Sequence, residues 1–287
     1  MDHCFLRYPG GKAKAVTFSY DDGLRLDIRT AQTLTAHNLK GTFNICAAWL
    51  GWEPACRNIM PEDIMEHIVN AGHEVAVHGN EHKAPGLFFP TDTIQDVLNC
   101  RLGLEKLTGK IIRGMAYPNT GIRNMQNGNT YANIKQILTN LGIVYARSLG
   151  ADNNGFRLPE DWHNWIPTCH HDNPNSLQWA KDFVEMDVDH YYVAHRYPRL
   201  FYVWGHSYEF QNKNNWDHLE ALCETLAGKD DIWYATNMEI YEYVKAYESL
   251  VLSANGKTFY NPTLYTIWFI NRDTIYSIAP GQTLTVE

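Results

Sequence analysis

The sequence has no long apolar segment, no C-x-x-C pair and no excess of positive charge. Its longest apolar runs are far too short to cross a bilayer, which argues against a membrane protein. The formal net charge of −8 argues against nucleic acid or an anionic membrane as the main partner. The six cysteines are scattered, and a chain of 287 residues can bury a core without disulfides, so neither a zinc ribbon nor a disulfide framework is indicated.

We expect no signal peptide in this sequence, because residues 1–11 contain no apolar stretch. We therefore expect a cytoplasmic protein, or a secreted or periplasmic one if a leader was removed. The length suits one large α/β barrel or two smaller domains. The 9 Trp, 17 Tyr and 11 Phe suit a carbohydrate-handling surface and a large core equally well.

Two adjacent carboxylates and a glycine follow an apolar, β-branched run at 15–18. The run predicts a buried strand, and Asp21-Asp22-Gly23 predicts the turn that ends it. Neighbouring side chains leave an extended backbone on opposite sides, so one aspartate could hold a cation while the other handles a proton. Ordinary turn chemistry is the alternative interpretation, because Asp-Gly is common after strands.

Strands and helices alternate along most of the chain. Strands are predicted at 15–18, 42–46, 74–77, 111–117, 143–146, 200–204 and 232–235, with helical spacing between them. Seven strand–helix units favour parallel pairing and come close to the count of a barrel. After residue 249 the helical spacing ends, and Asn255-Gly256 is a hairpin signal. We expect a barrel domain over 1–250 and a β extension over 251–287, packed on or beside the barrel, through which the protein could form a homo-oligomer.

Reactive groups in parallel barrels lie where strands end. The residues found near predicted strand ends are Asp21, Asp22, His78, His82, Arg113, Tyr117 and His206. His78 and His82 are four apart, so a compact turn would place both imidazoles on one side. Two imidazoles and one carboxylate form a three-ligand site with an open position, which suits Zn²⁺. Accidental spacing is the alternative, since 13 histidines yield such pairs by chance, as at 169–172.

These motifs together resemble the polysaccharide deacetylases, the NodB-like domain of carbohydrate esterase family four. The resemblance covers about residues 15–245 and implies a distorted, TIM-like (β/α)7 barrel that removes acetyl groups from sugars with a metal ion. One divalent ion is implied, with Zn²⁺ favoured and Co, Ni or Mn as alternatives. By the first motif, 20–23, Asp21 is the expected base and Asp22 a metal ligand. By the second, 78–82, His78 and His82 are the other ligands, although Gly79 replaces the usual hydroxyl residue.

The remaining motifs imply further roles. In the third, 113–121, Arg113 is expected to orient Asp21, and the Tyr117 N–H to bind the oxyanion. In the last, 200–206, His206 is the expected general acid. The fourth motif matches least well, with Asp161 and Trp165 as its counterparts.

The tryptophans Trp49, Trp52, Trp162 and Trp165 could form a sugar-stacking platform, and each suits the core equally well. Glu209 is either a substrate contact or a solvated side chain. We expect a metal-dependent hydrolase whose partner is its substrate, an N-acetylated saccharide that it deacetylates. An O-acetyl esterase, a sugar-binding pseudoenzyme and a hydrolase of a small cyclic amide are the alternatives.

Overall fold

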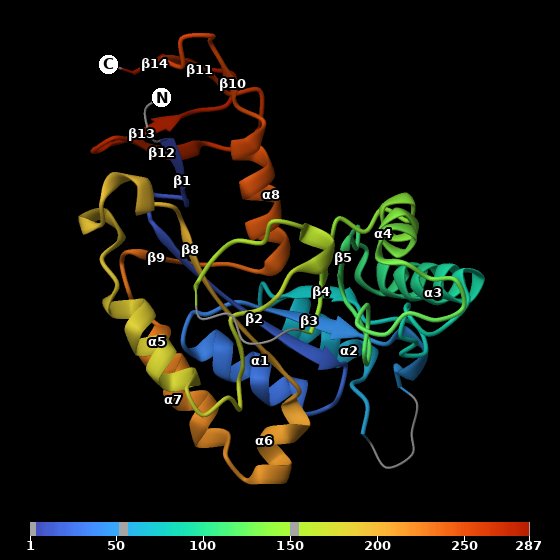
Figure 1. The fold of residues 1–287 in the computed structure, drawn as a ribbon. Coiled ribbons are helices and arrows are strands. Elements are labelled where there is room, and N and C mark those ends of the chain that lie inside the picture. The colour runs from blue at the N-terminus through green and yellow to red at the C-terminus, as the bar shows by residue number, and fades with distance from the viewer. Residues whose placement is uncertain (1–3, 52–56, 150–154, 287) are drawn as a thin grey trace.

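A parallel sheet forms the centre of the computed structural model, which describes residues 4–51, 57–149 and 155–286 (Figure 1). Seven strands lie in the order β6–β5–β4–β3–β2–β8–β7, and every neighbouring pair is parallel. These strands are β2 (Lys14–Asp22), β3 (Gly41–Ile45), β4 (Glu74–Val77), β5 (Gly114–Ala116), β6 (Tyr145–Arg147), β7 (Cys169–His170) and β8 (Arg199–Gly205). The sheet curls into half a barrel, which confirms the predicted (β/α)7 architecture.

The strand β2 lies in the middle of this sheet, and all nine of its residues are buried. On one side it pairs with β8 over residues 14–20, and on the other with β9 (Ile232–Tyr234) at 14–16 and with β3 at 18–22. A strand that is buried on both faces has a nearly continuous run of apolar residues in its sequence, as residues 15–18 do. The register sets Asp21 opposite Asn44, and β8 ends opposite Tyr20. The two aspartates therefore extend past the end of β8.

Helices cover the sheet, and two clusters of buried apolar side chains fill the space between helices and strands. The helices are α1 (Asp27–Ala36), α2 (Pro61–Asp63), α3 (Pro90–Thr108), α4 (Tyr131–Asn140), α5 (Ser176–Glu185), α6 (Ser207–Lys213), α7 (Trp216–Leu226) and α8 (Asn237–Glu248). The helix predicted from Pro61 continues as a π-helical segment, η2 (Ile64–Val69). Short 3₁₀ turns are η1 (Ala47–Trp49), η3 (Trp162–Asn164), η4 (Val188–His190) and η5 (Val193–His195). No described helix combines the length and apolar character needed to cross a membrane.

Strand boundaries differ from the predictions at three places that bear on the site. The strand β5 begins only at Gly114, so Arg113 precedes it, whereas β6 extends to Arg147. The two-residue strand β7 was not predicted, because Cys169 and His170 carry no apolar periodicity. Its pairing with β8 brings His170 level with Trp204, beside the end of the sheet.

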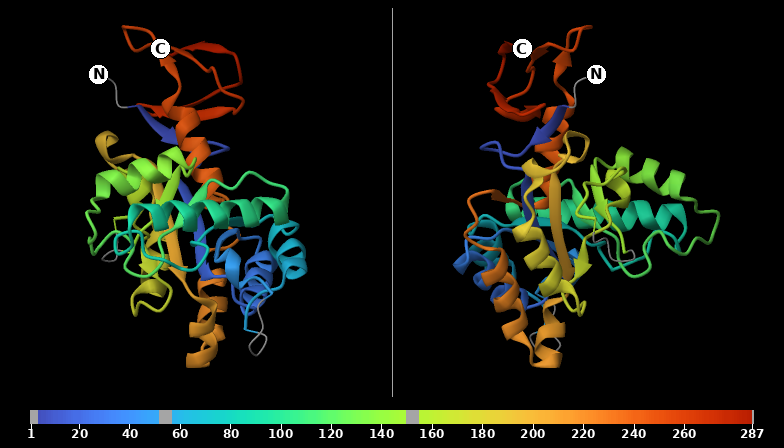
Figure 2. Two further views of the ribbon diagram at one scale, coloured as in Figure 1. Left: turned by 90° about the vertical axis from the view of Figure 1, so that its right-hand side faces the viewer. Right: turned by 60° about the vertical axis from the view of Figure 1, so that its left-hand side comes forward.

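Strands from both ends of the chain lie together beyond the end of α8 in all three views (Figures 1 and 2). The first small sheet has the order β1–β12–β13 and the second β10–β11–β14. Their bounds are β1 (Cys4–Arg7), β10 (Val251–Leu252), β11 (Thr258–Tyr260), β12 (Ile267–Asn271), β13 (Thr274–Ile278) and β14 (Thr283–Thr285). The pairing of β1 with β12 ties the N-terminal residues to the predicted extension. The division at residue 250 and an oligomer through the extension stay predictions.

Candidate functional site

The end of β2 directs two buried carboxylates towards different neighbours. Asp21 is 2% exposed and Asp22 is 9% exposed. Asp22 has a φ of 87°, a backbone conformation that costs a non-glycine residue of the order of 1–3 kcal/mol. Gly23 follows with φ +77°, and a Cβ there would lie 2.8 Å from Cγ2 of Ile45, so only glycine fits. This turn gives Asp21 and Asp22 separate surroundings.

Asp22 faces two imidazoles. Its Oδ1 lies 3.5 Å from Nε2 of His78 and 3.4 Å from Nε2 of His82. The three potential ligand atoms all lie within 4.8 Å of one another. Asp22 Oδ1 is buried and accepts no hydrogen bond, which is costly for a carboxylate oxygen unless a cation compensates it. The residues present therefore fit a divalent ion such as Zn²⁺, with an open coordination position.

Neighbouring groups fix both imidazoles. Nδ1 of His78 donates to the carbonyl of Ala116 at 3.0 Å, so in the neutral ring its Nε2 carries a lone pair. The Asn119 amide lies 3.1 Å from Nδ1 of His82 and donates to the His82 carbonyl at 3.0 Å. Burial, with the charge of His78, lowers the pKa of His82 to about 4. His82 is therefore neutral at pH 7, the state that binds metal.

Asp21 is held by a buried arginine. Nη2 of Arg147 donates to Asp21 Oδ2, and the Asn44 amide donates to Oδ1 at 2.9 Å. The Arg147 guanidinium also lies 4.5 Å from the ring centre of Trp204. Burial raises the pKa of Asp21, but the charges of Arg147, His78 and His206 outweigh it, so the pKa lies below its ordinary value. Asp21 is therefore ionised at neutral pH.

His206 is a third imidazole close to Asp21. Its Nε2 is 4.0 Å from Asp21 Oδ2, and its Nδ1 is 3.3 Å from Oε2 of Glu209. The His206 backbone N–H donates to the same oxygen at 3.0 Å. Burial disfavours the charged ring, but the Glu209 hydrogen bond and the Asp21 charge outweigh it and raise the pKa of His206 to about 9. His206 therefore carries a proton at neutral pH.

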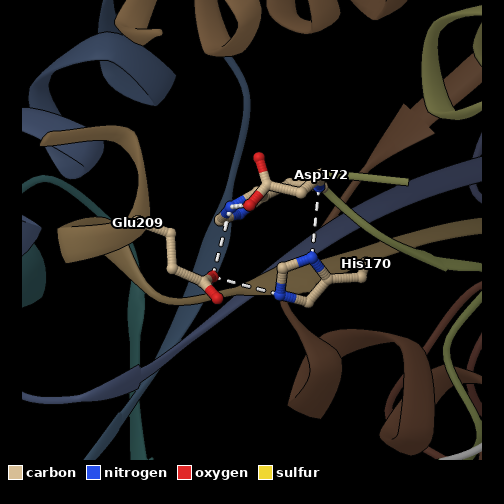
Figure 3. A group of neighbouring side chains, drawn as sticks. His170, Asp172 and Glu209 are labelled. Atoms are coloured by element: carbon tan, nitrogen blue, oxygen red, sulfur yellow. Dashed lines mark hydrogen bonds and ion pairs between the residues drawn. The ribbon is translucent and has the colours of Figure 1, made fainter. Parts of the chain in front are cut away.

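Two further histidines hold Glu209 in place, as Figure 3 shows for His170. Nε2 of His170 lies 3.0 Å from Glu209 Oε2, and Nε2 of His171 lies 3.3 Å from the same oxygen.

Together with Asp172, these three residues form a second group of side chains of the types that bind metal ions. The Asp172 N–H donates to Nδ1 of His170 at 3.2 Å, so the proton of the neutral ring is on Nε2 and faces Glu209. Lys213 already pairs with Asp172 at 2.5 Å. His170 and Glu209 thus form a hydrogen-bonded pair behind His206, and both ring nitrogens of His171 are buried without a hydrogen bond to any described residue.

A pocket of about 250 Å³ opens over these side chains. Six predicted residues line it: Asp21, Asp22, His78, His82, Tyr117 and His206. Four further residues, which were not predicted, also line this pocket: Asn119, Leu149, Trp204 and Tyr208. Trp204 and Tyr208 each lie two positions from His206 in the sequence, so their closeness to a predicted strand end could have identified them as site residues. Trp49 lies close by, with its ring centre 5.4 Å from that of His82.

The predicted role of Arg113 is wrong. Arg113 precedes β5, and its nearest charged partner is Glu242, at 3.8 Å. Arg147, which ends β6, pairs with Asp21 instead. Functional residues of parallel barrels follow strands, so the rule that found Asp21 and His206 also points to Arg147 at the end of the strand predicted at 143–146.

The predicted oxyanion role of Tyr117 is contradicted as well. Its backbone N–H donates to the carbonyl of Arg147 at 2.9 Å and so continues the pairing of β5 with β6. Its hydroxyl donates to the carbonyl of His163. Tyr117 lines the pocket but has no free backbone donor for a negatively charged oxygen.

Two of the predicted substrate residues belong to the scaffold. Trp165 is 0% exposed and packs edge-on against Trp162, Tyr145 and Tyr202. Asp161 caps η3 and pairs with Lys135 at 2.7 Å. Glu209 faces imidazoles, as described above. Trp52 lies outside the described residues, which leaves Trp49 as the predicted sugar contact nearest the site.

Replacing Arg147 or Arg113 with methionine will show which of the two arginines holds Asp21. We expect Arg147→Met to lower the free energy of unfolding by about 3–5 kcal/mol, because it leaves Asp21 as an unpaired buried charge. Arg113→Met will change it by about 1 kcal/mol or less, because its pair is 39% exposed on both sides. Urea unfolding curves measure both values. Equal losses in the two variants would contradict the assignment of Arg147.

Comparisons with known proteins agree with this architecture. Residues 9–146 match the polysaccharide deacetylase family. A proposed polysaccharide deacetylase from Mycobacterium smegmatis is 18% identical, with 86% of this chain and 96% of that one covered and a TM-score of 0.54. The structure of Puue Allantoinase is 14% identical, with 82% and 91% covered and a TM-score of 0.53.

The deacetylase PplD from Streptococcus pyogenes, solved with acetate, is 16% identical, with a TM-score of 0.42. That likeness covers 52% of this chain and 61% of PplD. No curated protein matches the chain. At these identities the solved structures show a common fold only. The match of residues 9–146 confirms the resemblance to the polysaccharide deacetylases, and the shared fold agrees with it.

Proposed function

We propose that the chain is a metal-dependent hydrolase that removes the acetyl group from an N-acetylated saccharide. One observation carries the proposal: Asp21 Oδ2 lies 4.0 Å from Nε2 of His78 and 4.0 Å from Nε2 of His206. The same carboxylate oxygen is thus close to a candidate metal ligand and to a protonated imidazole. A base, an activated water and an acid acting on one amide bond need this proximity.

The candidate ligands Asp22, His78 and His82 would hold one divalent ion. Such an ion lowers the pKa of its bound water and polarises an acyl oxygen. Asp21 would accept a proton from an attacking water as the oxygen of that water bonds to the acetyl carbon. His206 then gives its proton to the amide nitrogen as the carbon–nitrogen bond breaks. The products are acetate and the free amine of the sugar.

The proton states of Asp21 and His206 suit these opposite roles. Arg147 keeps the Asp21 carboxylate ionised, while Glu209 and Asp21 keep the His206 ring protonated. Titratable groups whose surroundings drive their pKa values apart are the usual basis of acid–base assignment. The base and the acid are therefore both in their active form near pH 7.

Metal analysis coupled to an acetate-release screen tests the proposal. We expect one equivalent of divalent metal per chain and acetate release from N-acetylated mono- or oligosaccharides, which chelation abolishes and Zn²⁺ or Co²⁺ restores. Full turnover in metal-free protein would contradict the mechanism. Metal and sugar binding without acetate release would indicate a pseudoenzyme.

An O-acetyl esterase would use all of these residues, so relative turnover on matched N-acetyl and O-acetyl sugars decides between the two. A hydrolase of a small cyclic amide has less support, because the three candidate ligands Asp22, His78 and His82 fit a metal ion.

Replacing Glu209 with glutamine will change the pH profile of this reaction. A neutral amide supports the His206 charge less well, so the pKa of His206 falls and the alkaline limb of kcat moves to lower pH. Each unit of decrease reduces the protonated fraction above the pKa about tenfold. Turnover measured from pH 6 to pH 10 detects the change.

Glu220→Gln is the matched control for this experiment, since Glu220 pairs with His37, a histidine outside the pocket, at 3.1 Å. Its profile should coincide with that of the native protein. If the limbs of both variants coincide with the native one, Glu209 does not act on His206.

A further inference from the structure

A second pocket lies directly beside the candidate active site. It has a volume of about 530 Å³, and its lining includes Arg25, Arg29, Gln32, Arg57 and Tyr208. Tyr208 lines both this pocket and the active-site pocket. The centre of its ring is 5.2 Å from that of His206. The second pocket, called here the arginine pocket, is therefore on the side of the site that holds the candidate acid.

The arginine pocket concentrates positive charge in a chain whose formal net charge is −8. Among the described residues, no ion pair involves Arg25, Arg29 or Arg57, and the lining includes no acidic side chain. Carboxylate partners do exist for Arg7, Arg101, Arg113, Arg147 and Arg196. Three guanidinium groups at one pocket, with no carboxylate partner in the part of the chain that the structure describes, form a ready site for an anion.

The scaffold brings these side chains together from two segments. The backbone N–H of Arg25 donates to the carbonyl of Arg57 at 2.9 Å, and Leu24 pairs with Asn58 in an isolated bridge. The Arg29 guanidinium lies 4.2 Å from the ring centre of Trp216. Stacking uses the face of a guanidinium and leaves its in-plane N–H groups free for a bidentate contact with an anion.

We infer that the arginine pocket binds an anionic substituent of the substrate, which is then an N-acetylated saccharide bearing carboxylate or sulfate groups. The inference rests on the proposed deacetylase function. His206 protonates the leaving amine, so the sugar lies on the side of His206 when the bond breaks. Tyr208 and the arginine pocket lie on that same side, within reach of a substituent on the sugar or on its neighbour. Gln32 adds a neutral amide for a hydroxyl group.

Three matched oligosaccharides test the inference. The first alternates N-acetylglucosamine with glucuronic acid, the second is the same chain with its carboxyl groups reduced to alcohols, and the third is a 6-O-sulfated N-acetylglucosamine oligomer. We expect the native protein to prefer a charged substrate over the neutral one by about 10- to 100-fold in kcat/KM, mainly through KM, as charge-assisted hydrogen bonds would give. Whichever charged substrate is preferred identifies the anion.

The double variant Arg25→Gln/Arg57→Gln should lose this preference while its kcat/KM on the neutral substrate is unchanged. Both side chains are exposed, and their mutual hydrogen bond is between backbone atoms, so the fold should persist. Arg113→Gln, outside the pocket, should behave as the native protein does. Equal kcat/KM on all three substrates, or a preference that survives the double variant, overturns the inference.

A binding measurement separates this inference from the proposed function. Calorimetry on Asp21→Asn protein, which should not turn over substrate, compares the charged and reduced oligosaccharides directly. Tighter binding of the charged chain that depends on Arg25 and Arg57 supports the arginine pocket, even if no acetate is released by the native protein. Acetate release without any such difference supports the deacetylase and removes the anionic substrate class.

Discussion

Asp22→Asn will remove both the bound metal and the turnover of this protein. Asp22 supplies the only oxygen among the three candidate ligands, and its Oδ1 lies within 3.5 Å of both imidazole nitrogens. A neutral amide binds a divalent ion much more weakly than a carboxylate. Since metal assistance contributes several kcal/mol, turnover should fall by at least about 1,000-fold. Elemental analysis and acetate release measure the two effects on the same preparation.

Asparagine is the informative replacement at this position because it tolerates the positive φ that Asp22 adopts, whereas alanine would add backbone strain. The unfolding midpoint of the variant should therefore stay close to that of the native protein. Asp182→Asn, in the exposed part of α5, is the control and should retain metal and turnover. A metal-replete, fully active Asp22→Asn protein would exclude Asp22 as a ligand.

Asp21→Asn will separate proton transfer from metal binding. The amide is nearly isosteric, and its oxygen can accept the Asn44 or the Arg147 hydrogen bond. It cannot accept the proton of an attacking water, a contribution worth about 10²- to 10⁴-fold in rate. We expect a normal metal content and a decrease of that size in kcat, with little change in KM.

The matched control is Asp27→Asn, because Asp27 is a second fully buried aspartate near the same turn. Burial raises the pKa of Asp27 to about 7, and its Oδ2 accepts the Leu24 N–H, which an amide oxygen can also do. Its kcat should match that of the native protein. An Asp21→Asn protein with native kcat, or with as little metal as Asp22→Asn, would contradict the division of labour between the two aspartates.

The sequence predicted the fold because long buried strands leave a clear pattern. The strand at 74–77 was predicted with the bounds that the structure has, and the centre of β2 was found from its apolar run. The strand ends then located Asp21, Asp22, His78 and His206, which line one pocket. Adjacent parallel strands end at the same edge, so a one-dimensional pattern can locate this part of a site.

The predictions that failed depend on strand register and tertiary contacts, which the spacing of residues in the sequence does not reveal. The third motif implied that Arg113 orients Asp21, but Arg113 precedes β5, whereas Arg147 ends β6 and was not predicted as a site residue. The bond from the Tyr117 N–H to Arg147 depends on the register of β5 against β6. Whether a tryptophan stacks on sugar or fills a core depends on tertiary contacts, and those of Trp165 are entirely internal.

The pairing of β1 with β12 has a consequence for how the chain folds during synthesis. Residues 4–7 are made long before their partners at 268–271. Contacts of such large sequence separation form late, because the entropy of closing the intervening loop must be offset before they contribute. The parallel sheet can assemble earlier, since its last strand in the chain, β9, ends at Tyr234. The sheet at the termini would then close in a separate, final step, during which β1 remains an open edge.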